Sequence, residues 1–177
     1  MKWVGGKFIG GKFAIGRFNR LLTPPVPANP VKNYWSLLCT ETQNAGWYGI
    51  RNLEFRATLG GADLTNDGAG GTAIAGADRG PPREAAQAFD NNSTDTYWGC
   101  DKDTIPSTDC YVGMNLTTAS AVLQISMQAR DDASFYDQMP RAFILRYSDD
   151  GVTWVDHFTI TGEPNWSRNE IRTYDVV

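Results

Sequence analysis

The chain has 177 residues, of which 41% are hydrophobic and 12% aromatic, enough for one domain with a core plus an appendage. The net charge of −4 divides into five basic and no acidic residues over 1–31, and eleven basic and twenty acidic residues over 32–177. The acidic body argues against nucleic acid as its main ligand, and no apolar run is long enough to insert into a membrane as a spanning helix.

Residues 1–22 carry a short repeat in which a basic residue precedes an aromatic one. The pairs recur every five residues, so they would not stack on one face of a helix, and in a strand successive pairs would point to opposite faces. We expect this arm to anchor the protein by ordering against other proteins or copies of itself; a disordered leader is the alternative. The aromatic members are Trp3, Phe8, Phe13 and Phe18.

Residues 23–32 follow as a stiff, extended spacer, because four prolines fall between Thr23 and Pro30. The basic start of the chain lacks the continuous apolar region of a signal peptide. This pattern predicts synthesis in a cytoplasm without export by the general route. The domain itself is expected over residues 33–177.

Seven segments of this domain are expected to be strands, because apolar and polar residues alternate in them or apolar residues dominate. Residues 82–89 (PREAAQAF) look helical, and residues 60–80, rich in Gly, Ala and Asp, indicate a long loop. Eighteen glycines and nine prolines agree with a turn-rich chain. The pattern predicts an all-β fold, an antiparallel β-sandwich. The expected strands are residues 33–40, 50–57, 110–116, 123–129, 142–147, 152–160 and 170–176.

Two motifs within this pattern carry a resemblance. Residues 147–154, YSDDGVTW, predict a hairpin whose turn uses Gly151 at positive φ. Residues 88–98, AFDNNSTDTYW, are similar to a segment A-x-D-G-N-x-x-T-x-W, with Asn91 in place of the usual glycine. Together they resemble the discoidin, or F5/8 type C, family of galactose-binding-like jelly-roll sandwiches. The resemblance implies a module that binds glycans or lipid headgroups and seldom does chemistry.

The order of the motifs is unusual for that family. Its members usually end with strands of the types Y-W-R-L and A-E-L-E-F, which resemble YWSL at residues 34–37 and RNLEF at residues 51–55. Here both precede the segment around Asp90. The sequence therefore resembles a circularly permuted member, an order associated with phage structural proteins, and the closeness of termini in sandwiches makes such a permutation physically reasonable.

The resemblance also implies one structural Ca²⁺, held by hard oxygen donors of a loop. Carried over to this sequence, its side-chain ligands would be Asp90, Asn92, Thr94 and Glu54, with main-chain carbonyls near Ala88. The alternative is an Asx-turn at Asp90 closed by Thr94, with Glu54 facing solvent.

A glycan would bind at loops at one end of the sandwich, with an aromatic ring stacked on the sugar and polar side chains bonded to its hydroxyls. The candidate loops are residues 43–48, 95–101, 130–141 and 162–168. The alternative for residues 130–141 is that Phe135 and Tyr136 fold back on the rim. The candidate ligand-binding residues are Trp47, Tyr48, Tyr97, Arg130, Asp131, Phe135, Tyr136, Arg141 and Trp166.

The residues that usually carry catalysis do not form a recognisable set. His157 is the only histidine, and no Ser-His-Asp, Cys-His or cysteine-rich metal pattern can be built from this sequence. Three cysteines fit no closed disulfide framework, although Cys100 and Cys110 could be bridged or could remain thiols. We therefore expect a protein that is not an enzyme.

These patterns together predict a phage virion component, made in the host cytoplasm. Its arm would dock on other virion proteins, and its sandwich would bind a host cell-surface glycan, without nucleic acid as a partner. We expect a homo-oligomer within the particle, because weak single sites usually act through multivalency. The alternative is a purely structural decoration, head-fibre or tail subunit that makes only protein contacts.

Overall fold

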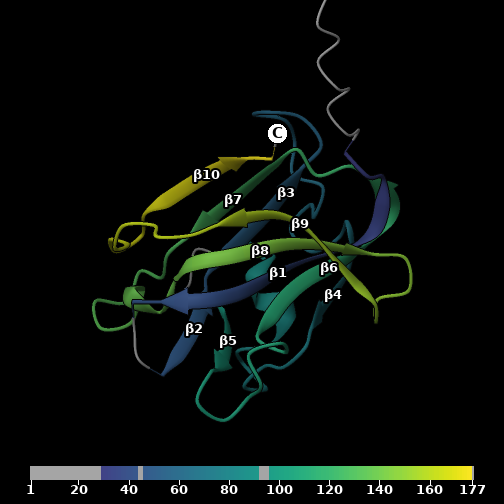
Figure 1. Ribbon diagram of the computed structural model, residues 1–177. Helices are drawn as coiled ribbons and strands as arrows, with labels where there is room; N and C mark the ends of the chain where they lie inside the picture. Colours follow the sequence, from purple (N-terminus) through teal and green to yellow (C-terminus); the bar gives the residue numbers. More distant parts are fainter. Residues whose placement is uncertain (1–28, 44–45, 92–95, 177) are drawn as a thin grey trace, which may run out of the picture.

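The computed structural model describes residues 29–43, 46–91 and 96–176, and this part of the chain folds into antiparallel β-sheets (Figure 1). The arm of residues 1–22, with Trp3, Phe8, Phe13 and Phe18, lies outside the described residues. No helix in the described part has the length and hydropathy to cross a membrane. The strands are β1 (Lys32–Thr42), β2 (Trp47–Ile50), β3 (Asn52–Arg56), β4 (Gly71–Ala75), β5 (Trp98–Asp101), β6 (Tyr111–Ser120), β7 (Gln124–Gln128), β8 (Pro140–Ser148), β9 (Trp154–Ile160) and β10 (Ile171–Asp175).

The described strands form a sandwich with a small additional ribbon. A five-stranded sheet has the order β4-β6-β1-β8-β9, and a three-stranded sheet has the order β10-β7-β3. Strands β2 and β5 pair as a two-stranded ribbon, seen at the lower end of Figure 1. Two short 3-10 helices, η1 (Ala85–Ala88) and η2 (Tyr136–Gln138), interrupt the connections. The predicted all-β sandwich is thus confirmed.

The core lies between the two larger sheets. Alternate residues of β1 and β8 point inward, so that Trp35, Leu37, Phe143 and Leu145 are fully buried. The ring of Phe143 meets that of Tyr174 on β10 edge to face, with 5.0 Å between centroids. Burying each large apolar side chain stabilises the fold by about 1.5–3 kcal/mol. The side chains buried between the two sheets therefore hold the sheets together.

The first strand of the described chain is the central strand of the larger sheet. Leu37 of β1 lies opposite Val112 of β6 on one side and Leu145 of β8 on the other. Strands β6 and β8 therefore do not pair with each other in the described sheet; each of them pairs with β1, which lies between them. Strand β3 likewise pairs with β7, beside β10.

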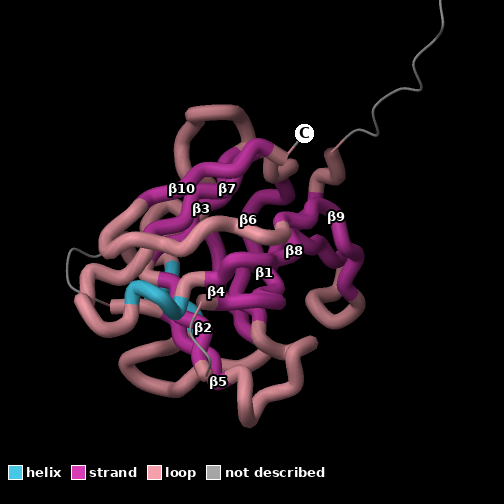
Figure 2. The backbone as a smooth tube through the Cα atoms, turned by 60° about the vertical axis from the view of Figure 1, so that its left-hand side comes forward, coloured by secondary structure: helices cyan, strands magenta, loops and turns pink. Residues whose placement is uncertain are grey.

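The start of the described chain lies beside its end. Asn29 Nδ2 donates to the carbonyl oxygen of Val176 (3.3 Å), and His157 Nε2 donates to Asn29 Oδ1 (3.0 Å). Burial lowers the pKa of His157, which favours the neutral imidazole in this contact. Figures 1 and 2 both show the C-terminal end next to the start of the described chain.

The hairpin between β8 and β9 differs from the expected one in length. Gly151 has φ +74°, as the turn requires. Asp150 Oδ1 accepts bonds from the backbone N–H groups of Val152 (2.8 Å) and Thr153 (2.7 Å), which hold the pKa of this carboxyl well below its usual range. Because these amides are bonded to Asp150, they cannot pair with β8, and the return strand begins at Trp154 instead of Val152.

Three other expectations need correction. The single strand expected over 50–57 is divided at Arg51 into β2 and β3, which belong to different sheets. The expected loop over 60–80 contains β4, an edge strand of small residues whose Gly71 comes so close to Asn115 of β6 that no Cβ would fit. The expected helix over 82–89 is reduced to the single 3-10 turn η1.

A disulfide joins Cys100 of β5 to Cys110, the residue before β6, with 5.8 Å between their Cα atoms. It ties the β2–β5 ribbon to the five-stranded sheet. Cys39 remains a buried thiol, and burial raises its pKa well above the usual range. The bridge closes a loop of about ten residues, which in the chain-entropy account stabilises a fold by roughly 3 kcal/mol.

Replacing Cys100 and Cys110 together by alanine should therefore lower the free energy of unfolding by roughly 3 kcal/mol, measured by urea denaturation at constant m. As a control, alkylation of the unfolded wild-type protein without reductant should label one cysteine. Labelling of all three cysteines would contradict the bridge.

Candidate functional site

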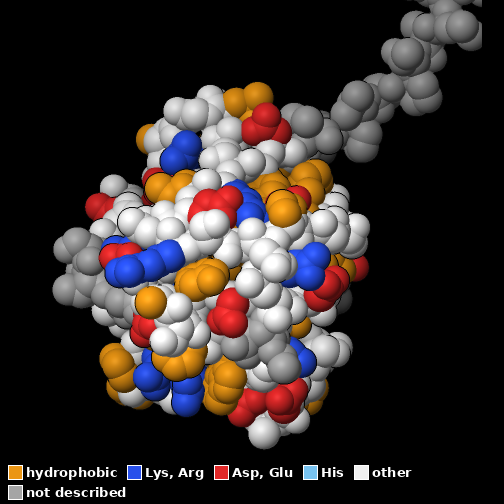
Figure 3. All heavy atoms as spheres, turned by 90° about the vertical axis from the view of Figure 1, so that its left-hand side faces the viewer, with side chains coloured by type: hydrophobic (Ala, Val, Ile, Leu, Met, Phe, Trp, Pro, Cys, Tyr) orange, Lys and Arg blue, Asp and Glu red, His pale blue; other side chains and the backbone are white. Residues whose placement is uncertain are grey.

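Three arginines from segments far apart in the sequence line one small cavity. Arg79 and Arg83 lie in the connection between β4 and η1, and Arg130 lies in the connection between β7 and η2. The cavity, here called the arginine cavity, has a volume of about 160 Å³. At the β2–β5 end of the molecule, the surface in Figure 3 shows basic side chains set between hydrophobic ones. The lining residues are Arg79, Arg83, Tyr97, Arg130, Asp132, Phe135 and Gln138.

Aromatic rings hold the guanidinium groups of these arginines. Arg79 lies over the ring of Trp47 at 3.8 Å, and Arg130 lies over the ring of Tyr97 at 3.6 Å. Arg83 donates from Nε to the hydroxyl oxygen of Tyr97. Stacking on a ring fixes the plane of a guanidinium while its N–H groups still point outward in that plane. The arrangement therefore preorganises donors around the cavity.

Arg130 is the most deeply held of the three, with 4% of its surface exposed. Its Nη1 donates to Gln138 Oε1 at 3.0 Å, and its Nη2 lies 3.5 Å from Asp132 Oδ2. A second ring, that of Phe135, lies 5.1 Å from its guanidinium carbon. A buried charge needs such partners to offset its lost hydration, so these contacts hold Arg130 in a fixed position in the cavity lining.

Two facing glycines of the β2–β5 ribbon make room for this cluster. Gly49 and Gly99 lie opposite each other in the ribbon. A Cβ on Gly49 would lie 2.9 Å from Gln138 Oε1, and a Cβ on Gly99 would lie 3.2 Å from the ring of Tyr97. Glycine within a strand often marks such a close approach. The ribbon therefore acts as a flat support on which Tyr97 and Gln138 pack.

The cavity is strongly cationic although the body of the protein is acidic. Among the described residues, Asp132 is the one carboxylate in its lining, against three arginines. Neither Arg79 nor Arg83 forms an ion pair with any described residue. A larger hollow of about 480 Å³ lies at β4 and η1, but its described lining consists of small side chains together with Asp78 and Glu84 and includes no basic residue. The arginine cavity is therefore the stronger candidate site.

Comparison with known families agrees with this fold. A sequence model of the F5/8 type C domain matches residues 72–176. The chain belongs to the F5/8 type C family. No curated protein and no solved structure matches the chain. F5/8 type C domains are typically binding modules and not enzymes, and the family suggests carbohydrate or a similar ligand. The match covers β4 to β10 and leaves β1, β2 and β3 outside it.

The arginine cavity of this F5/8 type C domain contains some of the residues proposed from the sequence. Tyr97, Arg130 and Phe135 line it, and Trp47 supports Arg79. Phe135 is 44% exposed, whereas Tyr136 packs against the core. Of the two aromatic residues in this loop, only Phe135 is thus available to a ligand in the cavity. Sequence reasoning missed Arg79 and Arg83. The available signal was a pair of basic residues close together in the sequence, Arg79 in the expected loop over 60–80 and Arg83 in the expected helix over 82–89.

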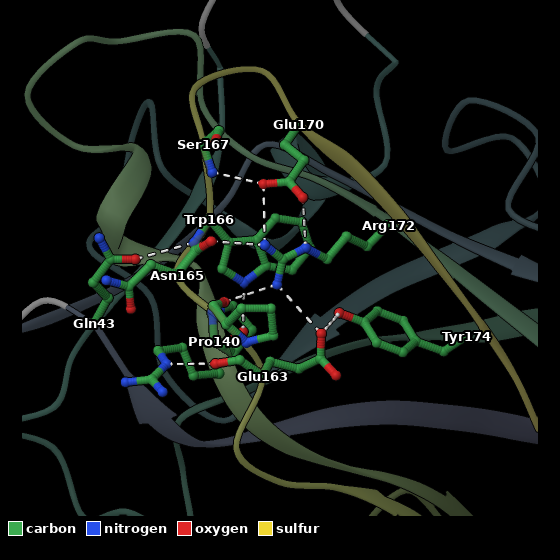
Figure 4. Close-up of polar contacts among 11 residues, drawn as sticks. Gln43, Pro140, Glu163, Asn165, Trp166, Ser167, Glu170, Arg172 and Tyr174 are labelled. Atoms are coloured by element: carbon green, nitrogen blue, oxygen red, sulfur yellow. Dashed lines mark hydrogen bonds and ion pairs between the residues drawn. The ribbon is translucent and has the colours of Figure 1, made fainter.

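Three aromatic candidates are buried. Tyr97 still lines the arginine cavity, but for Tyr48 and Trp166 the expectation that they face a ligand is corrected. Tyr48 is 4% exposed and Trp166 is 2% exposed. Trp166 donates from Nε1 to the carbonyl oxygen of Pro140 (2.9 Å), and Arg172 covers its ring at 4.1 Å. Figure 4 shows Glu163 and Glu170 converging on that same guanidinium. Trp166 therefore closes the end of the sandwich and offers no ring face to a sugar.

Arg141 and Asp131 are engaged outside the arginine cavity. Arg141 Nε donates to the carbonyl oxygen of Glu163 (2.6 Å), and its Nη1 lies 3.6 Å from Glu41 Oε1. Asp131 Oδ1 accepts a bond from Arg168 Nε (2.7 Å). These contacts fasten the 162–168 loop to its neighbours, so both residues support the structure of this end of the F5/8 type C domain.

The expected calcium ligands are described only in part, because Asn92 and Thr94 lie outside the described residues. Asn91 has φ +48°, the conformation for which the family uses glycine. Asn52 Nδ2 donates to Asn91 Oδ1 (2.5 Å) and to Glu54 Oε1 (3.4 Å), so Glu54 lies beside this loop. Asp90 Oδ2 accepts a bond from Thr96 (2.9 Å).

The two described carboxylates provide the hard oxygen donors that Ca²⁺ uses, and in this respect they fit the ion. Glu54 Oε2 also pairs with Arg56 at 2.5 Å, so a cation would compete with Arg56 for it. Within the described ranges, no three acidic, histidine or cysteine side chains form a metal-binding group.

Proposed function

We propose that this F5/8 type C domain binds a host cell-surface glycan and that the arginine cavity is its binding site. The observation that carries the proposal is the convergence of Arg79, Arg83 and Arg130 on one cavity, each held by an aromatic ring. Preorganised donors bind without the entropy cost of ordering flexible side chains. The protein acts as a binding module, without catalysis.

We further propose that the protein is a phage virion component, anchored by residues 1–22. Two sequence features support this role. The basic–aromatic repeat needs a partner to bury its rings, and the charge changes from positive over residues 1–31 to strongly negative over the domain. Arm and domain thus present surfaces suited to different partners, and copies assembled on a particle would bind glycan multivalently.

A circularly permuted order is the third part of the proposal. The family match begins at Thr72, yet β1 completes the larger sheet and β3 the smaller one. The contact between Asn29 and Val176 supports the permutation, because the two ends of a domain that lie side by side can be joined and the chain reopened elsewhere.

The alternative is a structural subunit that makes only protein contacts, and the outer face of the five-stranded sheet favours it. There Arg146 is buried between the rings of Tyr111 (4.9 Å) and Trp154 (5.1 Å). Its Nε and Nη2 make no hydrogen bond with any described residue. Strand β9 forms the edge of the sheet, with Val155 46% exposed. Unpaired strand edges are templates for protein contacts.

A glycan array of bacterial surface polysaccharides decides between the two. The full-length protein should bind particular polysaccharides, and the variant with both Arg79 and Arg83 changed to glutamine should lose that binding while its melting temperature stays unchanged. A folded protein that binds none of them would favour the structural subunit.

The anchoring role has a separate test. Deleting residues 1–22 should leave a folded domain with unchanged glycan binding that no longer joins the particle. Normal incorporation of the truncated protein into particles would overturn the anchoring proposal.

We also propose that Asp90, Asn92, Thr94 and Glu54 hold a structural Ca²⁺, which would tie the loop after η1 to β3. A native-state ligand stabilises by about 2.7 kcal/mol when its free concentration is a hundred times its Kd. A chelator should therefore lower the melting temperature of the wild-type protein, and Asp90→Asn should abolish that response. An equal melting temperature with calcium and with chelator would remove the site.

A further inference from the structure

We propose that the arginine cavity takes the oxyanion group of an acidic saccharide, a carboxylate, sulfate or phosphate attached to a sugar. The inference rests on the proposed glycan-binding function and narrows its ligand class. Its basis is the juxtaposition of three guanidinium groups, two of them without an ion-pair partner in the described part of the chain.

The geometry of the arginines suits an oxyanion better than a neutral hydroxyl. Guanidinium groups donate two parallel N–H bonds to carboxylate, sulfate or phosphate oxygens, and such charge-assisted bonds are about twice as strong as neutral ones. Arg79 over Trp47 and Arg130 over Tyr97 hold their planes in place before a ligand arrives. Among the described lining residues, Asp132 is the single carboxylate set against these three positive charges.

The aromatic rings at the site argue against a neutral sugar as the principal group recognised. A neutral pyranose binds largely by stacking its apolar face on an open ring. Arg79 already covers the ring of Trp47, and Arg130 covers that of Tyr97, which is 7% exposed. Phe135 is the one large hydrophobic residue of the described cavity lining that is markedly exposed. It can flank a sugar ring while the arginines bind its charged group.

The size of the cavity also indicates a substituent and not a whole ligand. Pockets that enclose a small molecule usually measure about 300–1,000 Å³, and the arginine cavity measures about 160 Å³. A charged group with its nearest sugar atoms fits such a space, while the rest of a polysaccharide would lie across the surface outside it.

An acidic saccharide is favoured over an anionic membrane, which has the same headgroup chemistry. Binding at a membrane surface is strengthened by exposed apolar side chains that enter the interface beside a basic site. The other large hydrophobic residues that are exposed in the described ranges, Val31, Leu59, Val152, Val155 and Ile171, do not line the cavity.

An array tests the inference with the full-length protein. Bacterial polysaccharides are printed in native form and after neutralisation, by methyl esterification of carboxylates or removal of sulfate and phosphate. The native acidic forms should bind, and neutralisation should reduce binding at least about tenfold. Equal binding to both forms, or binding only to neutral glycans, overturns the inference and leaves the proposed function standing. Binding to no saccharide overturns both the inference and the proposed function. Binding only to phosphatidylserine vesicles would show that the site takes a membrane ligand, and it overturns the saccharide proposal.

A titration with sulfate examines the cavity without any sugar. Sodium sulfate should shift the Nε–Hε NMR signals of Arg79 and Arg83, and sodium chloride at equal ionic strength should not. Unmoved signals overturn the anion site even if the array finds a glycan.

Single substitutions identify the residues. Arg79→Gln and Arg83→Gln should each weaken binding of the acidic glycan about tenfold. Lys32→Gln is the matched control, because it also removes one positive charge. Lys32 starts β1, roughly 30 Å along the strand from Thr42. The hydroxyl of Thr42 contacts the backbone of Asp137 and Met139 beside the cavity. An equal loss in the control would show nonspecific charge attraction and overturn the site.

Discussion

A fragment of residues 60–177 should remain unfolded, although it contains the entire family match. It lacks β1, the strand that lies between β6 and β8. Without β1, the five-stranded sheet is divided into two separate pairs, β4-β6 and β8-β9. It also lacks Trp35, Leu37, Leu53 and Phe55, all fully buried. Removing one such residue costs about 2–5 kcal/mol, and a whole domain is stable by only about 5–15 kcal/mol. Circular dichroism and amide proton dispersion would show the absence of a fold.

The same fragment should fold when residues 29–59 are attached behind Val177 through a linker of about four residues. The linker is short because Asn29 contacts Val176 at 3.3 Å. The cut falls at Leu59 and Gly60, which are exposed, where a new chain end is tolerated best.

Under the proposed permutation, this rearranged chain would have the usual family order, so its cooperative melting would support that proposal. A control with residues 29–59 in scrambled order should stay unfolded. Folding of residues 60–177 alone would contradict the role of β1, and failure of the rearranged chain would contradict the adjacency of the two ends.

Replacing Trp166 by alanine should lower the free energy of unfolding by about 3–5 kcal/mol. The indole is fully enclosed, its Nε1 is bonded to Pro140, and its ring supports the Arg172 guanidinium. Removing it leaves a cavity and takes the stacked face from Arg172, whose bonds to Glu163 and Glu170 hold the 162–170 loop. Urea denaturation would measure the loss.

Trp47→Ala is the informative comparison. Trp47 is half-buried at the rim and supports Arg79, so its removal should cost less stability but weaken glycan binding. For Trp166→Ala, binding measured well below the denaturation midpoint should be unchanged. Lost binding with unchanged stability would make Trp166 a ligand platform, as the sequence had suggested.

Strands were predicted correctly where the sequence has a long apolar or alternating apolar and polar pattern, and they were missed where it does not. β1, β7 and β8 were predicted closely, because apolar-rich or alternating segments mark their buried faces, whereas β6 was predicted to end at residue 116 but continues to Ser120. β4 was missed because its sequence, GTAIA, consists mostly of small residues packed at a sheet edge. β5 was missed because its four residues, WGCD, are too few for a period to emerge.

The candidate site was predicted less completely, for a related reason. Aromatic residues in loops were proposed as ring platforms, but a ring can as well face the core or an arginine. The ring of Trp166 faces the core, and the ring of Tyr97 faces Arg130. Neither outcome depends on nearby sequence, since Arg172 and Arg130 approach these rings from other segments of the chain.

The sequence by itself determined the all-β class, the hairpin with Gly151 at its turn, the family resemblance and the separation of a basic arm from an acidic domain. All of these rest on neighbouring residues, whose spacing and charge are local properties. Only the tertiary structure decided that β1 is central, that Cys100 meets Cys110, and that Arg79, Arg83 and Arg130 share one cavity. These depend on contacts between residues far apart in the chain, which the pairing of strands creates.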